Sequence, residues 1–257
     1  MRHHLRMDAP RLSNSTELQA MRRVGRLAAR TLALVGSRLA PGISTGDIDR
    51  WVREDTAKRG ARPSQLGYHG FPATVCTSRN EVVCHGIPRD DVKRGPGDII
   101  NVDITSELNG WHGDTSATFC IGEVTEEARH LVETTRRALE AGIAEVRPGA
   151  HLGDLGAAID ALARAAGCSV ITDWGGHGIG REMHLPPHVS HVGQRGEGLL
   201  LREGMTFTIE PMLTLGSPET RVLDDDWTVV TLDGNWSAQF EHTILVTRRG
   251  REVLTLV

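Results

Sequence analysis

Two carboxylates lie in a stretch that otherwise has the pattern of a buried β-hairpin. Residues 101–119 read NVDITSELNGWHGDTSATF, and the pair Asn109-Gly110 is typical of a two-residue turn. With that turn Asp103 lies diagonal to Asp114, and with Leu108-Asn109 as the turn the two acids lie directly opposite. Because side chains alternate along a strand, both registers place the acids on one face. Neighbouring carboxylates repel each other unless they share a proton or a metal ion. The hairpin alone does not choose between a metal site and a solvent-exposed face.

Three further stretches favour the metal site. TFTIEPM places Glu210 in an apolar run, and SAQFEHTILV places Glu241 at the start of a strand. DWGGHGIGREMH places His177 between glycines, where the backbone can approach a ligand closely. Each stretch alone is also explained by an edge carboxylate or a turn histidine. Four carboxylates with one imidazole suit two divalent ions. The set contains no thiolate, which excludes a Cys-rich structural zinc site.

Four helices are predicted to support these strands. The first is expected to begin after Thr16, which has Gln19 three positions later in a capping-box pattern. The apolar positions within it recur at helical spacing. The helices are expected at residues 17–39, after Thr45, from near Thr125, and at residues 152–166.

Two short motifs recur with one spacing, which predicts an internal duplication. PGISTGDI is followed by PGAHLGDL, and GDIINVD by GMTFTIE, each 107 residues later. The alternative is chance, since Pro-Gly after a helix is common. A real duplication predicts two halves about a pseudo-twofold axis, with one curved antiparallel sheet backed by helices. Asp103 of one half would then mirror Glu210 of the other. The four motifs begin at Pro41, Pro148, Gly97 and Gly204.

Composition and charge restrict the class of protein. The chain has 257 residues, of which 39% are hydrophobic and 24% charged, so it can bury a sizeable core. A net charge of −4 argues against a stable nucleic-acid binder. The apolar runs are too short for a signal peptide or a membrane span. The four cysteines, none in CxxC spacing, fit a reducing cytoplasm. Residues 1–16 are expected to be mobile, with Met7 as an alternative start.

The motifs together resemble those of type I methionine aminopeptidases. The matching stretches are YHGFPATVCTSRNEVVCHGIP, DIINVDITSELNGWHGDTS, GGHGIGREMH, FTIEPM and SAQFEHT. The resemblance runs from about residue 17 to residue 257 and implies the α+β pita-bread fold. It implies a single catalytic domain with halves at about 17–124 and 125–257. It also implies removal of the initiator methionine from new proteins when the next residue is small.

The resemblance assigns roles to the candidate metal ligands. Asp114 and Glu241 would bridge two divalent ions, which could be Co, Mn, Fe, Zn or Ni. Asp103 would chelate one ion, while His177 and Glu210 complete the other side. The ions would hold and activate a water molecule, and Glu210 would accept its proton. A monovalent cation near Asn80 and Ser237 is implied by resemblance alone.

The resemblance also assigns substrate contacts. His85 would contact the scissile amide, and His184 the substrate carbonyl and the tetrahedral intermediate. Relatives commonly carry Phe where this chain has Met183, which leaves the pocket wall in question. His112 faces the same side as Asp114 in a regular strand, and we do not expect it to be a ligand. The methionine pocket would be formed by Tyr68, Phe71, Cys76 and Trp227.

Two other classes of protein share this fold and are alternatives. Proline-specific pita-bread peptidases usually carry an extra N-terminal domain, for which the first 16 residues leave no room. Non-catalytic binding modules of this fold lose metal ligands, whereas all five positions are filled here. The expected partners are nascent polypeptide N-termini and, transiently, the ribosome. The chain is expected to be a cytoplasmic monomer.

Overall fold

A computed structural model describes residues 9–93 and 95–257 of the chain. Residues 1–8, which are part of the segment expected to be mobile, lie outside the described residues. The choice between Met1 and Met7 as the start lies outside them as well. Residues 9–14 run along the second half of the molecule. There Arg11 forms a β-bridge with Met205, and the Leu12 amide donates to the Gly204 carbonyl at 2.7 Å.

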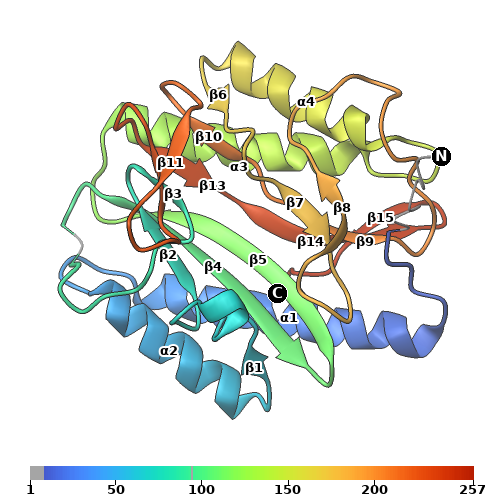
Figure 1. Ribbon diagram of the computed structural model, residues 1–257, viewed down its shortest axis with the longest axis horizontal. Helices are drawn as coiled ribbons and strands as arrows, with labels where there is room; N and C mark the ends of the chain where they lie inside the picture. The colour runs from blue at the N-terminus through green and yellow to red at the C-terminus, as the bar shows by residue number, and fades with distance from the viewer. Residues whose placement is uncertain (1–8, 94) are drawn as a thin grey trace.

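Antiparallel pairing joins most strands into one curved sheet (Figure 1). In the described residues this sheet has nine strands in the order β1-β4-β5-β14-β9-β7-β8, with β2 also on β4 and β15 also on β14. Their bounds are β1 Arg62–Pro63, β2 Cys76–Arg79, β4 Ile99–Leu108, β5 Trp111–Cys120, β7 Gly176–Gly178, β8 Leu185–Val189, β9 Thr206–Ile209, β14 Glu241–Thr247 and β15 Gly250–Val253.

Two smaller sheets lie beside this sheet (Figure 1). One three-stranded sheet has the order β13-β10-β6 and another the order β11-β12-β3. Within the described residues one 3₁₀ turn, η1, spans Tyr68–Gly70. The strand bounds are β3 Val82–Cys84, β6 Ser169–Val170, β10 Met212–Thr214, β11 Thr220–Val222, β12 Val229–Thr231 and β13 Ser237–Gln239.

The helices cover the back of the curved sheet (Figure 1). The described residues contain the four predicted helices: α1 Ser15–Arg38, α2 Thr45–Lys58, α3 Glu126–Glu145 and α4 Leu152–Ala165. The prediction of Thr125 as the cap of α3 is confirmed, because its side chain accepts from the Ala128 amide. The cap predicted for α1 is wrong. Asn14, not Thr16, accepts from the Glu17 amide, while Ser13 donates to the Glu17 carboxylate.

The predicted duplication is confirmed by matching backbone features. Gly42 and Gly149 have φ of 88° and 87°, and Gly97 and Gly204 have φ of 98° and 86°. These left-handed conformations suit glycine, which lacks a Cβ atom. The isolated β-bridges repeat the spacing of 107 residues, since Ser44 pairs with Lys93 and His151 with Leu200. The halves meet between β5 and β14, where Ser116 pairs with Glu241 and Thr115 with His242.

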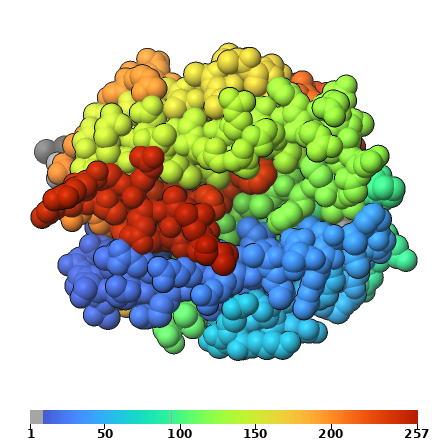
Figure 2. All heavy atoms as spheres, turned by 180° about the vertical axis from the view of Figure 1, so that it is seen from behind, coloured from blue at the N-terminus to red at the C-terminus, as the bar shows by residue number. Residues whose placement is uncertain are grey.

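Each half buries its own core between sheet and helices. Viewed from behind, α1 and α3 lie on either side of the C-terminal segment (Figure 2). On β4 the buried Ile100, Val102 and Ile104 pack with residues of α1 and α2. Side chains alternate along a strand, so Asp103 and Thr105 point to the opposite, concave face. None of the helices in the described residues has the length and apolarity that crossing a membrane requires.

Candidate active site

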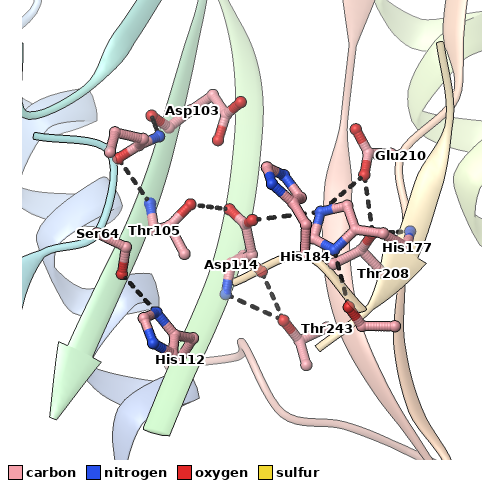
Figure 3. Close-up of polar contacts among 12 residues, drawn as sticks. Ser64, Asp103, Thr105, His112, Asp114, His177, His184, Thr208, Glu210 and Thr243 are labelled. Carbon is pink, nitrogen blue, oxygen red and sulfur yellow. Dashed lines mark hydrogen bonds and ion pairs between the residues drawn. The ribbon is translucent and has the colours of Figure 1, made fainter. Parts of the chain in front are cut away.

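The hairpin has the first of the two predicted registers. Leu108 pairs with Trp111, which leaves Asn109-Gly110 as the turn, and these two residues have φ of 55° and 76°. Asp103 therefore lies opposite Ser116, and Asp114 opposite Thr105. The two acids are diagonal neighbours on the concave face, as Figure 3 shows.

The five candidate ligands come from both halves of the molecule and line one cavity; Figure 3 shows four of them, Asp103, Asp114, His177 and Glu210. Asp103 comes from β4, Asp114 from β5, His177 from β7 and Glu241 from the first position of β14, while Glu210 follows β9 directly. His177 Nε2 lies 3.7 Å from Asp114 Oδ2 and 3.6 Å from Glu210 Oε1. One donor atom each from Asp114, His177 and Glu241 lie within 4.8 Å of one another. This is a compact group of metal-ligating atoms.

The arrangement of these buried carboxylates suits a site with a bound cation better than a site without a counter-charge. Asp103 Oδ1 and Glu241 Oε1 are buried without a hydrogen-bond partner. Of the described residues that line the surrounding cavity, none is Lys or Arg. Buried carboxylates without a counter-charge are costly, and a bound divalent ion would remove that cost. The unpartnered oxygens therefore match the metal implied by the donor set.

Burial raises the pKa values of the acids at this site, and a bound metal ion would lower them again. Burial, with neighbouring carboxylates, raises the pKa of Asp103 and Glu241 well above the usual range. Burial also raises the pKa of Glu210 to about 8 and that of Asp114 to about 6. Without metal Glu210 therefore retains its proton at pH 7, and a cation would displace it. Burial lowers the pKa of His177 to about 3, so its imidazole is neutral, the form that binds metals.

A set of hydrogen bonds that the sequence did not indicate orients the acids. Thr105 Oγ1 donates to Asp114 Oδ1 at 2.8 Å, and Thr208 Oγ1 to Glu210 Oε1 at 2.7 Å (Figure 3). Gln239 Nε2 donates to the second oxygen of Glu210 at 3.1 Å. These three side chains fix carboxylate rotamers at the site. Their signal in the sequence is weak, because Thr and Gln occur throughout the strands.

His191 is a further residue whose role the sequence did not reveal. The Glu210 amide donates to His191 Nε2 at 3.0 Å, and the imidazole is buried. Burial lowers the pKa of His191 to about 3. The ring is therefore neutral, accepts through Nε2 and carries its proton on Nδ1. It fixes the backbone that leads into Glu210.

A cavity of about 850 Å³ contains the acids together with the predicted substrate contacts. His184 has its ring centroid 4.2 Å from that of His177, and its Nδ1 lies 2.8 Å from the Tyr68 hydroxyl. His85 lies edge-on to Trp174 at 5.0 Å and has the uncommon φ of 56°. Burial is the main cause that lowers the pKa of both His85 and His184 to about 4. Both rings are therefore neutral at pH 7.

Apolar and sulfur-bearing side chains make up part of the lining of this cavity, here called its apolar wall. The ring centroids of Phe71 and Trp227 lie 5.1 Å apart, and the angle between the ring planes is 75°. Met183 is only 5% exposed and lines the cavity, so it stands where it can contact a substrate. Other residues of the wall are Tyr68, Cys76, Cys84, Trp174 and Met212, of which Cys84, Trp174 and Met212 were not predicted.

Two other sequence candidates lie apart from the acids. His112 Nδ1 lies 2.9 Å from Ser64 Oγ (Figure 3), and the residue does not line the cavity. Asn80 Nδ2 donates to Asp98 at 2.8 Å, and its carbonyl accepts from the Ser237 amide. Ser237 Oγ has no hydrogen-bond partner. The monovalent cation near Asn80 and Ser237 stays a prediction.

Comparisons with known proteins agree with a metal-dependent peptidase site. The sequence pattern that defines metallopeptidase family M24 matches residues 19–248. The chain belongs to metallopeptidase family M24. Its relatives in this family include "Methionine aminopeptidase B" of Synechocystis, 51% identical over 95% of this chain and 91% of the relative. "Methionine aminopeptidase 2" of Mycobacterium tuberculosis is 48% identical over 93% of this chain and 83% of the relative.

Solved structures of M24 peptidases confirm the pita-bread fold. The methionine aminopeptidase of Rickettsia prowazekii superposes with a TM-score of 0.94 at 43% identity, covering 96% of this chain and all of that one. The prolidase of Pyrococcus furiosus has a TM-score of 0.76 at 19% identity, and this chain covers 65% of it. The second likeness shows the fold alone. Among M24 peptidases, the comparisons therefore support the methionine-specific interpretation over the proline-specific one.

Proposed function

We propose that this M24 peptidase removes the initiator methionine from new polypeptides whose second residue is small. The observation that carries the proposal is the convergence of five donors, two with unpartnered buried oxygens, in one cavity with His85, His184 and a sulfur-rich wall. The partners would be nascent N-termini, met in the cytoplasm and transiently at the ribosome. We propose that the chain acts as a monomer.

Asp103, Asp114, His177, Glu210 and Glu241 would hold two divalent ions. Bound there, the ions supply Lewis acidity and bring the pKa of a water molecule into the neutral range. Carboxylates and a neutral imidazole accept several first-row metals. Co, Mn, Fe, Zn and Ni are therefore all candidates.

Glu210 is proposed as the general base. Thr208 and Gln239 each donate to one of its oxygens, which fixes the plane of the carboxylate toward the cavity. Once its own proton is displaced, this group can accept a proton from water and return it to the leaving amine. His191 holds the backbone amide of Glu210 at 3.0 Å and limits its movement.

His184 is proposed to stabilise the oxyanion of the tetrahedral intermediate. The Tyr68 hydroxyl at 2.8 Å from Nδ1 can donate to the neutral ring, which then carries its proton on Nε2. A donor at Nε2 suits the developing negative charge on the carbonyl oxygen. His85, which lines the same cavity beside Trp174, is proposed to contact the scissile amide.

The apolar wall is proposed to bind the methionine side chain. An unbranched thioether is flexible and makes favourable contacts with aromatic rings, so Phe71 and Trp227 with nearby sulfur atoms suit it. The requirement for a small second residue comes from the resemblance and is part of the proposal.

The decisive experiment compares peptides after metal removal. The metal-stripped protein is assayed on Met-Ala-Ser, Leu-Ala-Ser and Ala-Pro-Ser while Co²⁺, Mn²⁺, Fe²⁺ or Zn²⁺ is added back. We expect metal-dependent release of methionine and much slower release of leucine. Preferred cleavage of Ala-Pro-Ser would instead show a proline-specific peptidase. Metal binding without hydrolysis of any peptide would show a non-catalytic module.

A further inference from the structure

The outer edge of β4 has a gap in its strand pairing beside the acids. On this edge β1 pairs with β4 up to Pro63–Ser106, and β2 begins its pairing at Cys76–Asp103. The side chain of Gln65 fills the interval between these two strands. Its Nε2 donates to the Asp103 carbonyl at 2.8 Å, and its Oε1 accepts from the Thr105 amide at 3.1 Å. One side-chain amide thus takes the place of a backbone partner.

One residue held by Gln65 is a proposed metal ligand and the other orients a second one. The acid cluster consists of the five proposed ligands Asp103, Asp114, His177, Glu210 and Glu241. Asp103 is a proposed ligand whose Oδ1 has no hydrogen-bond partner. Thr105 donates through Oγ1 to Asp114 at 2.8 Å. Gln65 therefore fixes the backbone at one proposed ligand and at the residue that orients another. It is itself buried, with 6% of its surface exposed, so water does not readily replace it.

Gln65 also connects this strand to the substrate side of the cavity. The backbone carbonyl of Gln65 accepts from the Tyr68 amide at 3.0 Å at the start of η1. Tyr68 in turn contacts His184 through its hydroxyl. The side chain must present a donor and an acceptor together, two methylenes from the backbone. Glutamate lacks the donor, asparagine is one methylene shorter, and methionine has neither an amide donor nor its acceptor.

We propose that Gln65 is a positioning residue that sets the metal affinity of the site through Asp103 and Thr105. The inference rests on the proposed function only in taking the acid cluster as the metal site. Side chains that hold metal ligands in place typically contribute about 10–100-fold to metal affinity or activity. Loss of Gln65 should therefore weaken metal binding before it affects the fold.

The test uses Gln65→Met, which keeps the length of the side chain and removes its amide. Binding of Mn²⁺ to the metal-stripped protein is measured by calorimetry, and the visible spectrum of the Co²⁺-loaded protein is recorded. We expect Mn²⁺ affinity to fall by about tenfold or more and the Co²⁺ band to shift, because ligand geometry changes. The matched control is Gln19→Met on the exposed face of α1, which should match the wild type in both measurements.

A double-mutant cycle separates positioning from general destabilisation. Thr105→Val removes the hydroxyl that holds Asp114 but keeps the backbone amide that Gln65 binds. If Gln65 acts through Thr105, the double variant should lose less affinity than the product of the two single losses. Unchanged Mn²⁺ affinity and Co²⁺ spectrum in Gln65→Met would overturn the proposal, and strictly multiplicative losses would overturn the part of it that acts through Thr105. If Gln65→Met does not fold, Gln65→Asn carries the same test with the same expected direction. A wild-type protein that binds no divalent ion would refute the proposed function instead.

Discussion

The Tyr68 hydroxyl and His184 Nδ1 lie 2.8 Å apart, although the two residues are 116 positions apart in the chain. Tyr68 belongs to the first half and His184 to the second, so this contact spans the cavity between them. It leaves His184 Nε2 as the ring nitrogen available to a substrate. When Nδ1 accepts from this hydroxyl, Nε2 carries the proton and is a donor rather than a metal ligand.

His184→Ala should lower kcat strongly while the metal content stays near normal. Removing one donor to an oxyanion typically costs about 10²–10³ in kcat. Tyr68→Phe removes only the hydroxyl and should cost less, roughly fivefold for one hydrogen bond of about 1 kcal/mol. Kinetics and elemental analysis of both variants check this. Loss of bound metal in His184→Ala would make His184 a ligand and the five-residue set wrong.

Asp103→Asn should weaken metal binding by at least about tenfold, because it replaces a charged ligand with a neutral one of the same shape. Calorimetric titration of Mn²⁺ into the metal-stripped variant measures the loss. Asp224→Asn, on an exposed loop, is the matched control and should bind as the wild type does. Equal metal affinity in Asp103→Asn would remove Asp103 from the ligand set.

Met183→Phe should sharpen discrimination between methionine and its isosteres. A flat, rigid ring replaces a flexible side chain in the cavity wall, so the wall adapts less to a wrong substrate. The effect should be modest, since size differences in apolar pockets are worth only about 1–3 kcal/mol, and KM should change more than kcat. The measurement is kcat/KM for Met-Ala-Ser and norleucine-Ala-Ser in both proteins. Identical selectivity ratios would show that Met183 serves packing alone.

The metal-free protein should be most stable near pH 6.5. Burial raises the pKa of Glu210 to about 8 and that of Asp114 to about 6, so the folded state binds more protons than the unfolded chain. Stability from these acids is complete below about pH 4 and is lost as the pH rises toward 8. Histidines whose pKa burial lowers to about 3 or 4 act oppositely, and their contribution is lost as the pH falls below 6.5. They are His85, His177, His184, His191 and His242.

Melting temperatures measured from pH 5 to pH 9, with a chelator and then with Mn²⁺, check this pH dependence. Bound metal should reduce the loss above pH 6.5, because it displaces the protons that the acids otherwise retain. A metal-free protein whose melting temperature keeps rising from pH 6.5 to pH 8 would contradict the assignment of raised pKa values to the buried acids.

Local signals in the sequence predicted much of the fold. The cap of α3 could be predicted because the Thr125 hydroxyl, one residue before the helix, accepts from a nearby backbone amide and needs no distant partner. The cap of α1 was misplaced because Asn14 and Thr16 are both suitable residues, and the contact between Ser13 and Glu17 favours the earlier start. The hairpin register stayed open because period-two alternation puts Asp103 and Asp114 on one face in either case.

The residues that hold the acids could not be predicted in this way. Gln65 is 38 positions from Asp103, and His191 is 19 positions from Glu210. Each acts through a backbone group, which any residue type carries, so neither leaves a pattern of paired residue types. The five proposed ligands were found because carboxylates in apolar strands are unusual, and because several motifs resembled one family at once.

The repeated turns and bridges relate the two halves by a pseudo-twofold axis, and they put Asp103 on β4 and Glu210 just after β9 at equivalent positions, on either side of the pairing between β5 and β14. In an assembly of two identical copies, the contact surface around such an axis would be an isologous dimer interface. Each half supplies only part of the proposed donor set, two residues from one and three from the other. An ancestral single-length chain could therefore have presented this cluster only after self-association. Fusion of two copies would then have let each side of the interface acquire different ligands, which strict symmetry forbids.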